Sequence, residues 1–262
     1  MIVIKYGGHA LDGSMVSDSI IETISKYHLD GGRVVVVHGG GPAINAELAI
    51  HNVQTTMSSG YRVTTLDVMH VVQETLSGSV LRNLTNKFIS FGVNAVGISS
   101  GDGGILRARR FQPMVDGVRT DIGLVGEAES TDPTLLNLLL DHGYLPLISP
   151  VGVQSDGTAL NINADIAAGS IAGSLGAREI LFITDVAGIY RNWPDPDSLI
   201  SQISLEELEK IAPSFSDGMA PKSKAAITAL SSGAKMARII DGSNKSNLEK
   251  AFAGFGGTVV TT

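Results

Sequence analysis

The stretch VVVVHGGGPAIN, residues 34–45, contains a complete transition from a strand to a helix. Val34–Val37 is a short β-branched run, which is typical of a strand buried on both faces of a parallel sheet. Gly39, Gly40 and Gly41 then lead to a proline, which suits the first turn of a helix. Glycines at this place leave backbone N–H groups free for an anion, although an ordinary tight turn is the alternative. We favour the anion site because three successive glycines are more than a turn requires.

The same alternation of short apolar strands and helical patterns continues along the whole chain. Strands are predicted at Ile2–Ile4, Val34–Val37, Ala95–Ile98, Pro146–Ile148, Ile180–Ile183 and Ala237–Ile240. Helices are predicted at Ser17–Tyr27, Pro42–Ile50, Leu66–Thr75, Pro133–His142, Ala164–Leu175, Ser204–Ile211 and Lys222–Ser231. This order predicts a doubly wound α/β fold with a largely parallel sheet. One interruption, Ile105–Glu129, alternates apolar and polar residues and predicts a β-hairpin or a small antiparallel excursion.

The overall composition is that of a folded protein with a large core. Of the 262 residues, 43% are hydrophobic and 17% are charged, so long disordered segments are not expected. The chain has no cysteine, which excludes disulfides, thiolate catalysis and zinc–thiolate sites. The formal charge of −7 and the lack of a broad basic stripe disfavour nucleic acid and anionic membranes as partners. No apolar run approaches the roughly 20 residues of a membrane span, and no signal peptide is recognised, so a cytoplasmic location is predicted.

Two further segments place charges beside strand ends or helix starts. In IKYGGHA, Lys5 offers a compact cation next to Gly7 and Gly8, which would suit a phosphate; the alternative is a solvated lysine at a turn. In LNINADIAAG, the alternating Asn161, Asn163 and Asp165 precede an apolar helix. Asp165 could cap that helix or interact with its dipole, or these residues could present amides and a carboxylate to a ligand.

The segment SDGMAPKSKAAI places Lys222 at the start of a helix, where a positive charge opposes the helix dipole. Such a placement is expected if the cation serves a ligand. Lys224, two residues further on, should face elsewhere on the helix. Neither the Gly-Lys-Ser/Thr phosphate loop nor the Gly-x-Gly-x-x-Gly dinucleotide pattern occurs, and the six histidines show no metal-binding spacing, so no protein metal site is predicted.

The motifs KYGGHA, HGGGPAIN, GYRVT, NINADIAA, FITDVAGIY and GMAPKSKAA occur in this order, with GTVV close to the end. With these motifs, over essentially its whole length, the chain resembles the amino acid kinase family, and within it the branch that phosphorylates N-acetyl-L-glutamate in bacterial arginine biosynthesis. The resemblance implies a three-layer α/β/α sandwich with a mainly parallel central sheet. It also implies an N-terminal lobe, residues 1–176, that binds the amino acid and dimerises, and a C-terminal lobe, residues 177–262, that binds ATP.

The resemblance further implies a reaction in which the γ-phosphoryl group of ATP passes to the side-chain carboxylate, giving N-acetylglutamyl 5-phosphate and ADP. Lys5 and Lys222 would neutralise the moving group from either side, and Asp165 would hold both ammonium groups in place. The implied substrate-binding residues are Gly40, Gly41, Arg62 and Asn161. The implied nucleotide-binding residues are Gly7, Gly8, Asp185, Val186, Ala187, Gly188, Ile189, Tyr190, Ser214, Phe215 and Ser216. Mg²⁺ would be held chiefly by the ATP phosphates.

Three positions depart from the family pattern: a lysine is missing before Asp102, Leu81 replaces an asparagine, and RVTT replaces RVTD. These departures leave the Lys–Asp–Lys core intact and bear on the substrate more than on the reaction. The chain also begins at its first strand, without the N-terminal helix that builds a hexamer in arginine-inhibited members. A homodimer insensitive to arginine is therefore expected.

Two other readings of the same fold stay open. One is a kinase of glutamate or 2-aminoadipate carried on a small acidic protein, for which Arg107, Arg109 and Arg110 would form a docking cluster; a solvated hairpin face is the alternative for these arginines. The other is a catalytically silent amino-acid sensor. The presence of both lysines and of Asp165 argues against a silent sensor, because a pure binder does not need all three.

Overall fold

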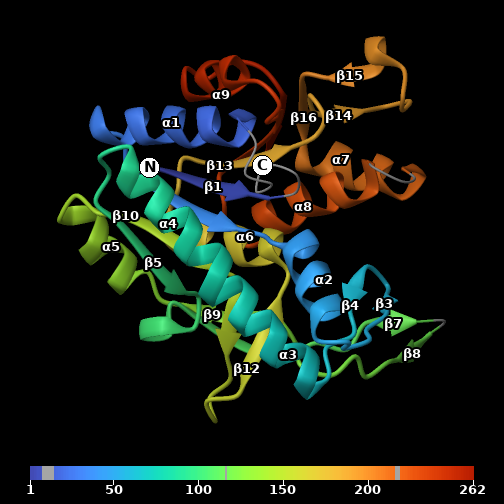
Figure 1. Ribbon diagram of the computed structural model, residues 1–262. Helices are drawn as coiled ribbons and strands as arrows, with labels where there is room; N and C mark the ends of the chain where they lie inside the picture. The colour runs from blue at the N-terminus through green and yellow to red at the C-terminus, as the bar shows by residue number, and fades with distance from the viewer. Residues whose placement is uncertain (8–14, 116, 216–218) are drawn as a thin grey trace.

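The structure is a computed structural model that describes residues 1–7, 15–115, 117–215 and 219–262 (Figure 1). Its largest feature is a central sheet of eight strands. The strands lie in the order β16 (Gln202–Ser204), β18 (Thr258–Thr261), β17 (Met236–Asp241), β13 (Glu179–Thr184), β1 (Ile2–Tyr6), β2 (Val34–His38), β10 (Leu145–Ser149) and β5 (Ala95–Ser99). The six strands predicted from the sequence are the neighbours from β17 to β5, and all of these pair in parallel. Only the edge differs, where β18 runs antiparallel to β17. The predicted mainly parallel sheet is confirmed.

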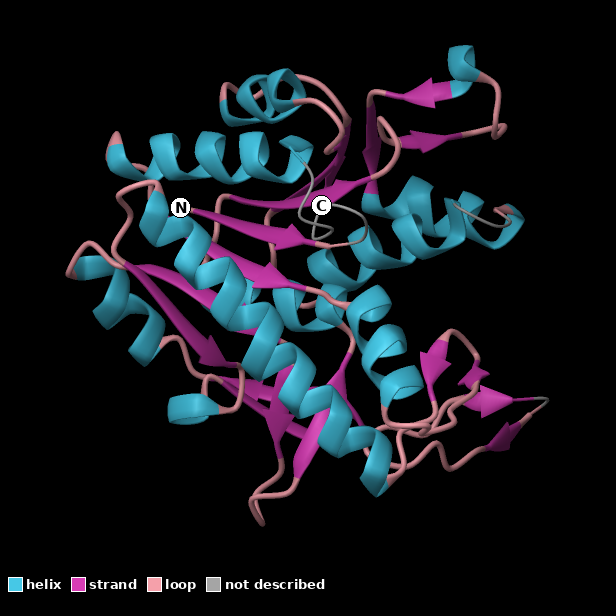
Figure 2. Cartoon of the chain, viewed as in Figure 1, coloured by secondary structure: helices cyan, strands magenta, loops and turns pink. Residues whose placement is uncertain are grey.

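Helices cover both faces of this sheet, as Figure 2 shows. Alternate residues of β1 divide between two separate cores: Ile2 and Ile4 pack on one face, and Val3 packs on the other. The first face is covered by α1 (Met15–Leu29), α4 (Leu81–Ser90) and α9 (Lys245–Phe252). The second is covered by α2 (Gly41–Ile50), α3 (Leu66–Gln73), α5 (Thr134–Asp141), α6 (Ala164–Ser174), α7 (Leu205–Ile211) and α8 (Met219–Ser231). This arrangement is the three-layer α/β/α sandwich that the resemblance implied.

All seven predicted helices are present, but the sequence did not indicate α4 or α9. A π-helix, η2 (Glu74–Val80), joins α3 directly to α4, so one long helical segment replaces the separate helix expected at 66–75. The Leu76 and Ser77 side chains of η2 lie at the ends of two sheet strands: Leu76 lies over Gly40, and Ser77 hydrogen-bonds Ser149 with 2.7 Å between the two hydroxyl oxygens. None of the described helices combines the length and apolar character that a membrane crossing needs.

The interruption at 105–129 is larger than the predicted excursion. Its strands β6 (Leu106–Arg110) and β9 (Val125–Thr131) pair antiparallel, as expected, with a small hairpin of β7 (Met114–Val115) and β8 (Val118–Arg119) between them. However, β6 and β9 also close a four-stranded barrel with β11 (Val151–Val153) and β12 (Ala159–Ile162). Because β12 leads directly into α6, this barrel positions the NINAD motif.

Short elements complete the fold. The hairpins are β3 (Met57–Ser58) with β4 (Tyr61–Arg62), and β14 (Ile189–Tyr190) with β15 (Leu199–Ile200). Single 3₁₀ turns occur at η3 (Asp102–Gly104), η4 (Pro196–Ser198) and η5 (Ala212–Ser214). The division into two lobes near Gly176 stays a prediction, because β1 of the first half pairs directly with β13 of the second half.

Close contact between α6 and α8 brings residues of the two halves together. A Cβ atom at Gly169 would lie 2.7 Å from Cα of Ala229, and one at Gly173 would overlap the backbone carbonyl of Ser232. Both clashes involve backbone, which cannot rotate away as a side chain can. The helices can therefore approach this closely only because these two positions lack side chains.

Replacing Gly173 by alanine is expected to lower the free energy of unfolding by about 1–3 kcal/mol, because the helices must separate to admit the methyl group. Urea denaturation of the two proteins measures this difference. The matched control is Gly78→Ala, since a Cβ at Gly78 meets nothing within 4 Å and the change should be neutral or slightly stabilising. Equal stability of Gly173→Ala and the parent protein would contradict the packing argument.

Candidate active site

Lys5 lies near the carboxyl end of β1 and forms an ion pair with Asp165 in the first turn of α6. Its Nζ is 3.0 Å from Oδ1 of Asp165, and the two side chains are only 20% and 25% exposed. A Cβ atom at Gly7 would lie 2.7 Å from the same Nζ. The glycine immediately after β1 therefore leaves the space that the ammonium group occupies, and a larger residue would displace it.

Lys222 reaches the same region from α8 and pairs with Asp185, the residue that follows β13. The distance from Nζ of Lys222 to Oδ1 of Asp185 is 3.0 Å, and the lysine side chain is 16% exposed. Partial burial raises the pKa of Asp185, but hydrogen bonds from Lys222 and from the Thr184 hydroxyl lower it by more, so this pKa lies below its ordinary value. Asp185 is thus held as a carboxylate beside the ammonium group.

The structure brings the three predicted catalytic residues together. Lys5, Lys222 and Asp165 line one cavity of about 140 Å³, whose walls also include Thr184 and the apolar Phe182. Two ammonium groups face a cavity of this size, and each has its own aspartate partner. Asp185, which the resemblance placed with the nucleotide contacts, is thus a partner of Lys222. Simultaneous support of both lysines by Asp165 stays a prediction.

The glycine-rich turn lies beside these groups. A Cβ at Gly39 would lie 3.7 Å from Cα of Gly7 and 4.0 Å from Cβ of Ala164, so the turn adjoins both the end of β1 and the start of α6. Gly40 is the N-cap of α2, and Gly41 is its first residue, with open space around the position of a Cβ. The backbone at Gly40 and Gly41 therefore forms a helix N-terminus close to the two segments that carry the Lys5–Asp165 pair, which suits the predicted role as anion donors.

A fully buried histidine forms a hydrogen bond with the backbone of the glycine turn. His38 ends β2, and its Nδ1 lies 2.8 Å from the carbonyl oxygen of Gly39, which can only accept, so this nitrogen carries the proton. Within the described residues, Nε2 has no hydrogen-bond partner. Burial lowers the pKa of His38 to about 4, against a smaller opposing effect of the bond to Gly39. His38 is therefore neutral at physiological pH.

This histidine should make stability depend on pH. Because its pKa is lower in the folded protein than in the unfolded chain, the unfolded state binds more protons between pH 6.5 and pH 4. Stability is therefore full above this window and is lost as the pH falls through it. On lowering the pH from 7 to 5, we expect the free energy of unfolding of the parent protein to fall by about 2 kcal/mol more than that of His38→Asn, as measured by urea denaturation. An identical pH dependence of the two proteins would contradict this role.

The predicted acceptor residues Arg62 and Asn161 are linked through one threonine. The Arg62 guanidinium donates to Oδ1 of Asn45 at 2.5 Å, and burial lowers the pKa of Arg62. The Asn161 amide donates to the Thr64 hydroxyl at 3.2 Å, and this hydroxyl donates to the carbonyl of Arg62 at 2.8 Å. The β4 and β12 segments thus place both residues in one hydrogen-bonded group.

The helix-capping role that the sequence allowed for Asp165 belongs to Asn163. Its Oδ1 accepts from the backbone N–H groups of Asp165 at 2.8 Å and Ile166 at 3.3 Å. Capping by Asn163 leaves the Asp165 carboxylate available for Lys5.

The predicted nucleotide residues surround the start of α8. Asp185, Val186, Ala187 and Gly188 form the bend between β13 and β14. A Cβ at Gly188 would lie 2.9 Å from the backbone nitrogen of Thr258, and the Tyr190 N–H lies 3.4 Å from Sδ of Met219 in α8. Ile189 is buried, and its N–H donates to the Thr258 hydroxyl at 2.7 Å. Ser214 closes η5 and Phe215 packs on the core, whereas Gly8 and Ser216 lie outside the described residues.

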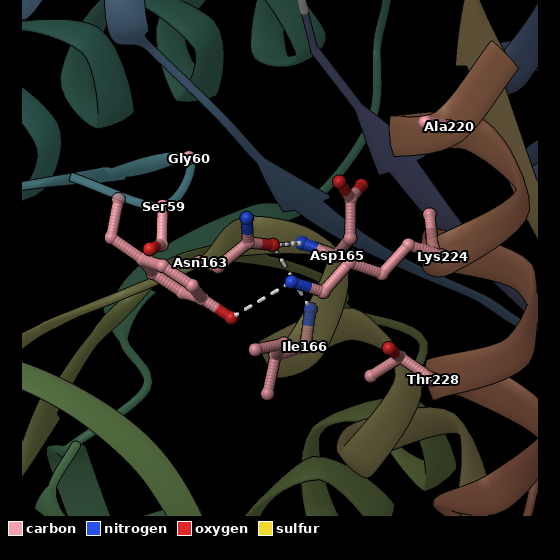
Figure 3. A pocket seen from close by; sticks show the side chains of 10 residues that line it. Ser59, Gly60, Asn163, Asp165, Ile166, Ala220, Lys224 and Thr228 are labelled. Carbon is pink, nitrogen blue, oxygen red and sulfur yellow. Dashed lines mark hydrogen bonds between the residues drawn. The ribbon is translucent and has the colours of Figure 1, made fainter. Parts of the chain in front are cut away.

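A second cavity adjoins the first and contains a cation that sequence reasoning did not assign (Figure 3). It has a volume of about 340 Å³ and shares Asp165 and Ala225 with the smaller cavity. Lys224 of α8 points across it, with Nζ 3.4 Å from the Tyr61 hydroxyl and 5.0 Å from the centre of the Tyr61 ring. No sequence pattern links positions 61 and 224, so the sequence alone does not pair these two residues.

Metal-binding side chains do not gather here: in the described part of the chain, no three His, Cys, Asp or Glu residues are placed to hold a metal ion. Asp165, which lines the smaller cavity, and Asp185, which pairs with a lysine of that cavity, are each engaged by one ammonium group.

Comparison with known proteins gives one family and two kinds of relative. The model of the "Amino acid kinase family" matches residues 1–241. An acetylglutamate kinase from Paenarthrobacter aurescens is 42% identical over 251 residues, which cover 92% of this chain and 79% of that protein. An acetylglutamate kinase from Rhodococcus jostii is 40% identical, and the match covers 100% of this chain and 85% of that protein.

Solved structures agree on the fold. N-acetylglutamate synthase from Neisseria gonorrhoeae, complexed with coenzyme A and N-acetyl-glutamate, superposes with a TM-score of 0.84 at 25% identity. The match covers all of this chain but 59% of the synthase, so this chain spans little more than half of that protein. Carbamate kinase from Giardia lamblia bound to AMP-PNP superposes with a TM-score of 0.70 at 20% identity. This match covers 100% of this chain and 98% of the carbamate kinase chain.

Proposed function

Because the chain belongs to the amino acid kinase family, we propose that it transfers the γ-phosphoryl group of ATP to the side-chain carboxylate of N-acetyl-L-glutamate. The products are N-acetylglutamyl 5-phosphate and ADP, and the biosynthetic role is in arginine synthesis. The observation that carries this proposal is the similarity to acetylglutamate kinases, at 40–42% identity over 92% of the chain. The two Lys–Asp pairs around one cavity give that similarity a chemical basis.

In the proposed mechanism, the protein mainly positions groups and neutralises charge. The acceptor carboxylate is already ionised at pH 7, so no general base is required. Lys5 and Lys222 neutralise the oxygens of the moving phosphoryl group, where little covalent help is needed. Asp165 and Asp185 hold the two ammonium groups at 3.0 Å each, which limits their mutual repulsion. The backbone N–H groups at Gly40 and Gly41 donate to the attacking carboxylate, and Arg62 and Asn161 hold the rest of the acceptor.

The nucleotide is proposed to lie against the bend at 185–190 and against Ser214 and Phe215, in the C-terminal lobe, with residues 1–176 holding the acceptor. Mg²⁺ would accompany the ATP phosphates and add positive charge there, since the nearby carboxylates of Asp165 and Asp185 already pair with lysines. We also propose that the chain forms a homodimer, as the family resemblance implies, and light scattering tests this.

A hydroxamate assay with ATP and magnesium tests the reaction, because hydroxylamine traps acyl phosphates. We expect a signal with free N-acetylglutamate. A signal only with glutamate or 2-aminoadipate on a carrier protein would favour the carrier-dependent kinase, and no signal with any acid would favour a silent sensor. In the arginine cluster, Arg109 already pairs with Glu127 on the neighbouring strand at 2.9 Å, which weakens its attraction for an acidic carrier.

A further inference from the structure

Lys224 links two parts of the site that the fold otherwise separates by a cavity. Its ammonium group crosses the 340 Å³ cavity from α8 toward the hairpin that carries Ser59 and Gly60, as Figure 3 shows. The contact made there is with Tyr61, at 3.4 Å from the hydroxyl and 5.0 Å from the ring centre. Tyr61 is itself fixed, because its ring packs at a tilt against Phe111, with 4.8 Å between the ring centres.

A solvated lysine would be the ordinary interpretation of an exposed position such as 224. Two observations argue against it here. Among the described residues, no carboxylate pairs with Lys224, whereas Asp165 in the same cavity is engaged with Lys5. The cation also lies within the distance at which an aromatic ring attracts an ammonium group. The side chain is therefore directed across the cavity by Tyr61.

Each end of this contact adjoins a residue of the proposed reaction. On α8, Lys224 is two residues beyond Lys222, which lines the smaller cavity with Lys5 and Asp165. On the hairpin, Tyr61 immediately precedes Arg62. The contact therefore connects the helix that carries a phosphoryl-binding lysine to the strand that carries an acceptor-binding arginine.

We propose that Lys224, through its contact with Tyr61, is a positioning residue that holds α8, and with it Lys222, in register with the acceptor hairpin. This proposal rests on the proposed kinase function. A displacement of about 1 Å of a reacting or stabilising group can reduce a rate by up to about 100-fold. The Lys224–Tyr61 contact between α8 and the hairpin can therefore affect turnover without touching the substrate.

The test uses Lys224→Met, which keeps the length of the side chain and removes its charge. We expect kcat in the hydroxamate assay to fall about 10-fold, with the KM values for ATP and for N-acetylglutamate changed less than about threefold. Lys224→Arg should recover most of the rate, because a guanidinium also stacks on an aromatic ring. Lys210→Met is the matched control: Lys210 is an exposed lysine on α7, paired with Glu206 one helical turn away, and its loss should leave kcat unchanged.

A double-mutant cycle with Tyr61→Leu identifies the contact itself. If Lys224 acts through Tyr61, the double variant should be no slower than the slower single variant. Additive effects on kcat would overturn the proposal, as would an unchanged kcat in Lys224→Met. A rise of KM for N-acetylglutamate in Lys224→Met alone would also overturn it, because it would place Lys224 on the substrate. An inactive parent protein would instead refute the proposed function, so the two failures are distinguishable.

Discussion

Alanine at position 222 is expected to lower turnover by at least about 100-fold, which is the scale of losing one preorganised electrostatic stabiliser. Lys222 faces the same cavity as Lys5, and its 16% exposure means that water can replace the ammonium group only in part. Its removal also leaves the Asp185 carboxylate facing the incoming phosphates, which adds repulsion where neutralisation is needed.

Steady-state kinetics in the hydroxamate assay measure this loss, with urea denaturation as a check that Lys222→Ala is folded. Lys210→Ala is the control, because Lys210 lies on α7 and pairs with Glu206, outside both cavities. A rate close to that of the parent protein would remove Lys222 from the mechanism.

The largest expected effect on stability comes from the buried ion pair between Glu179 and Arg238. Both side chains are almost inaccessible, at 2% and 4% exposure, and Nε of Arg238 lies 2.5 Å from Oε1 of Glu179. The guanidinium also donates to the carbonyls of Gly256 at 2.7 Å and Gly254 at 3.2 Å. Glu179→Ala would leave this guanidinium buried without its counter-ion, so the free energy of unfolding should fall by about 3–5 kcal/mol.

Urea denaturation of Glu179→Ala tests this expectation. The matched control is Asp141→Ala, which breaks the exposed pair with Arg33 at 2.8 Å and should cost less than about 1 kcal/mol. The double variant Glu179→Leu/Arg238→Met should regain much of the lost stability, because it removes both charges together. A loss for Glu179→Ala as small as that of the control would show that the buried charge is not costly.

Features with a local sequence signature were predictable. The six parallel strands are short β-branched runs, such as Val34–Val37, and a strand buried on both faces must be apolar throughout. The glycine turn was predictable because a proline and a helix follow three glycines. The convergence of Lys5 and Lys222 came from the family resemblance, since 216 intervening positions separate them and no local pattern joins them.

Features that depend on contacts between distant residues were not predictable. Helix α4 has no N-cap residue to mark its start, because η2 runs directly into it. The preceding residues 77–80 contain two serines and a glycine, which do not indicate a helix. The barrel closes through β11 and β12, which have only three and four residues, too few for a clear alternation. The pairing of Lys222 with Asp185, and of Lys224 with Tyr61, is set by the packing of α8 in three dimensions.

The π-helix between α3 and α4 determines how this part of the chain tolerates changes of length. A π-turn accommodates more residues than an α-turn, and one residue corresponds to about 100° of rotation in a regular α-helix. Deleting a single residue at 74–80 would therefore convert the π-turn into an α-turn and keep Leu81, Leu84 and Phe88 directed at the core they now fill. A second deletion would find no extra residue to remove, and it would rotate these three side chains away from the core.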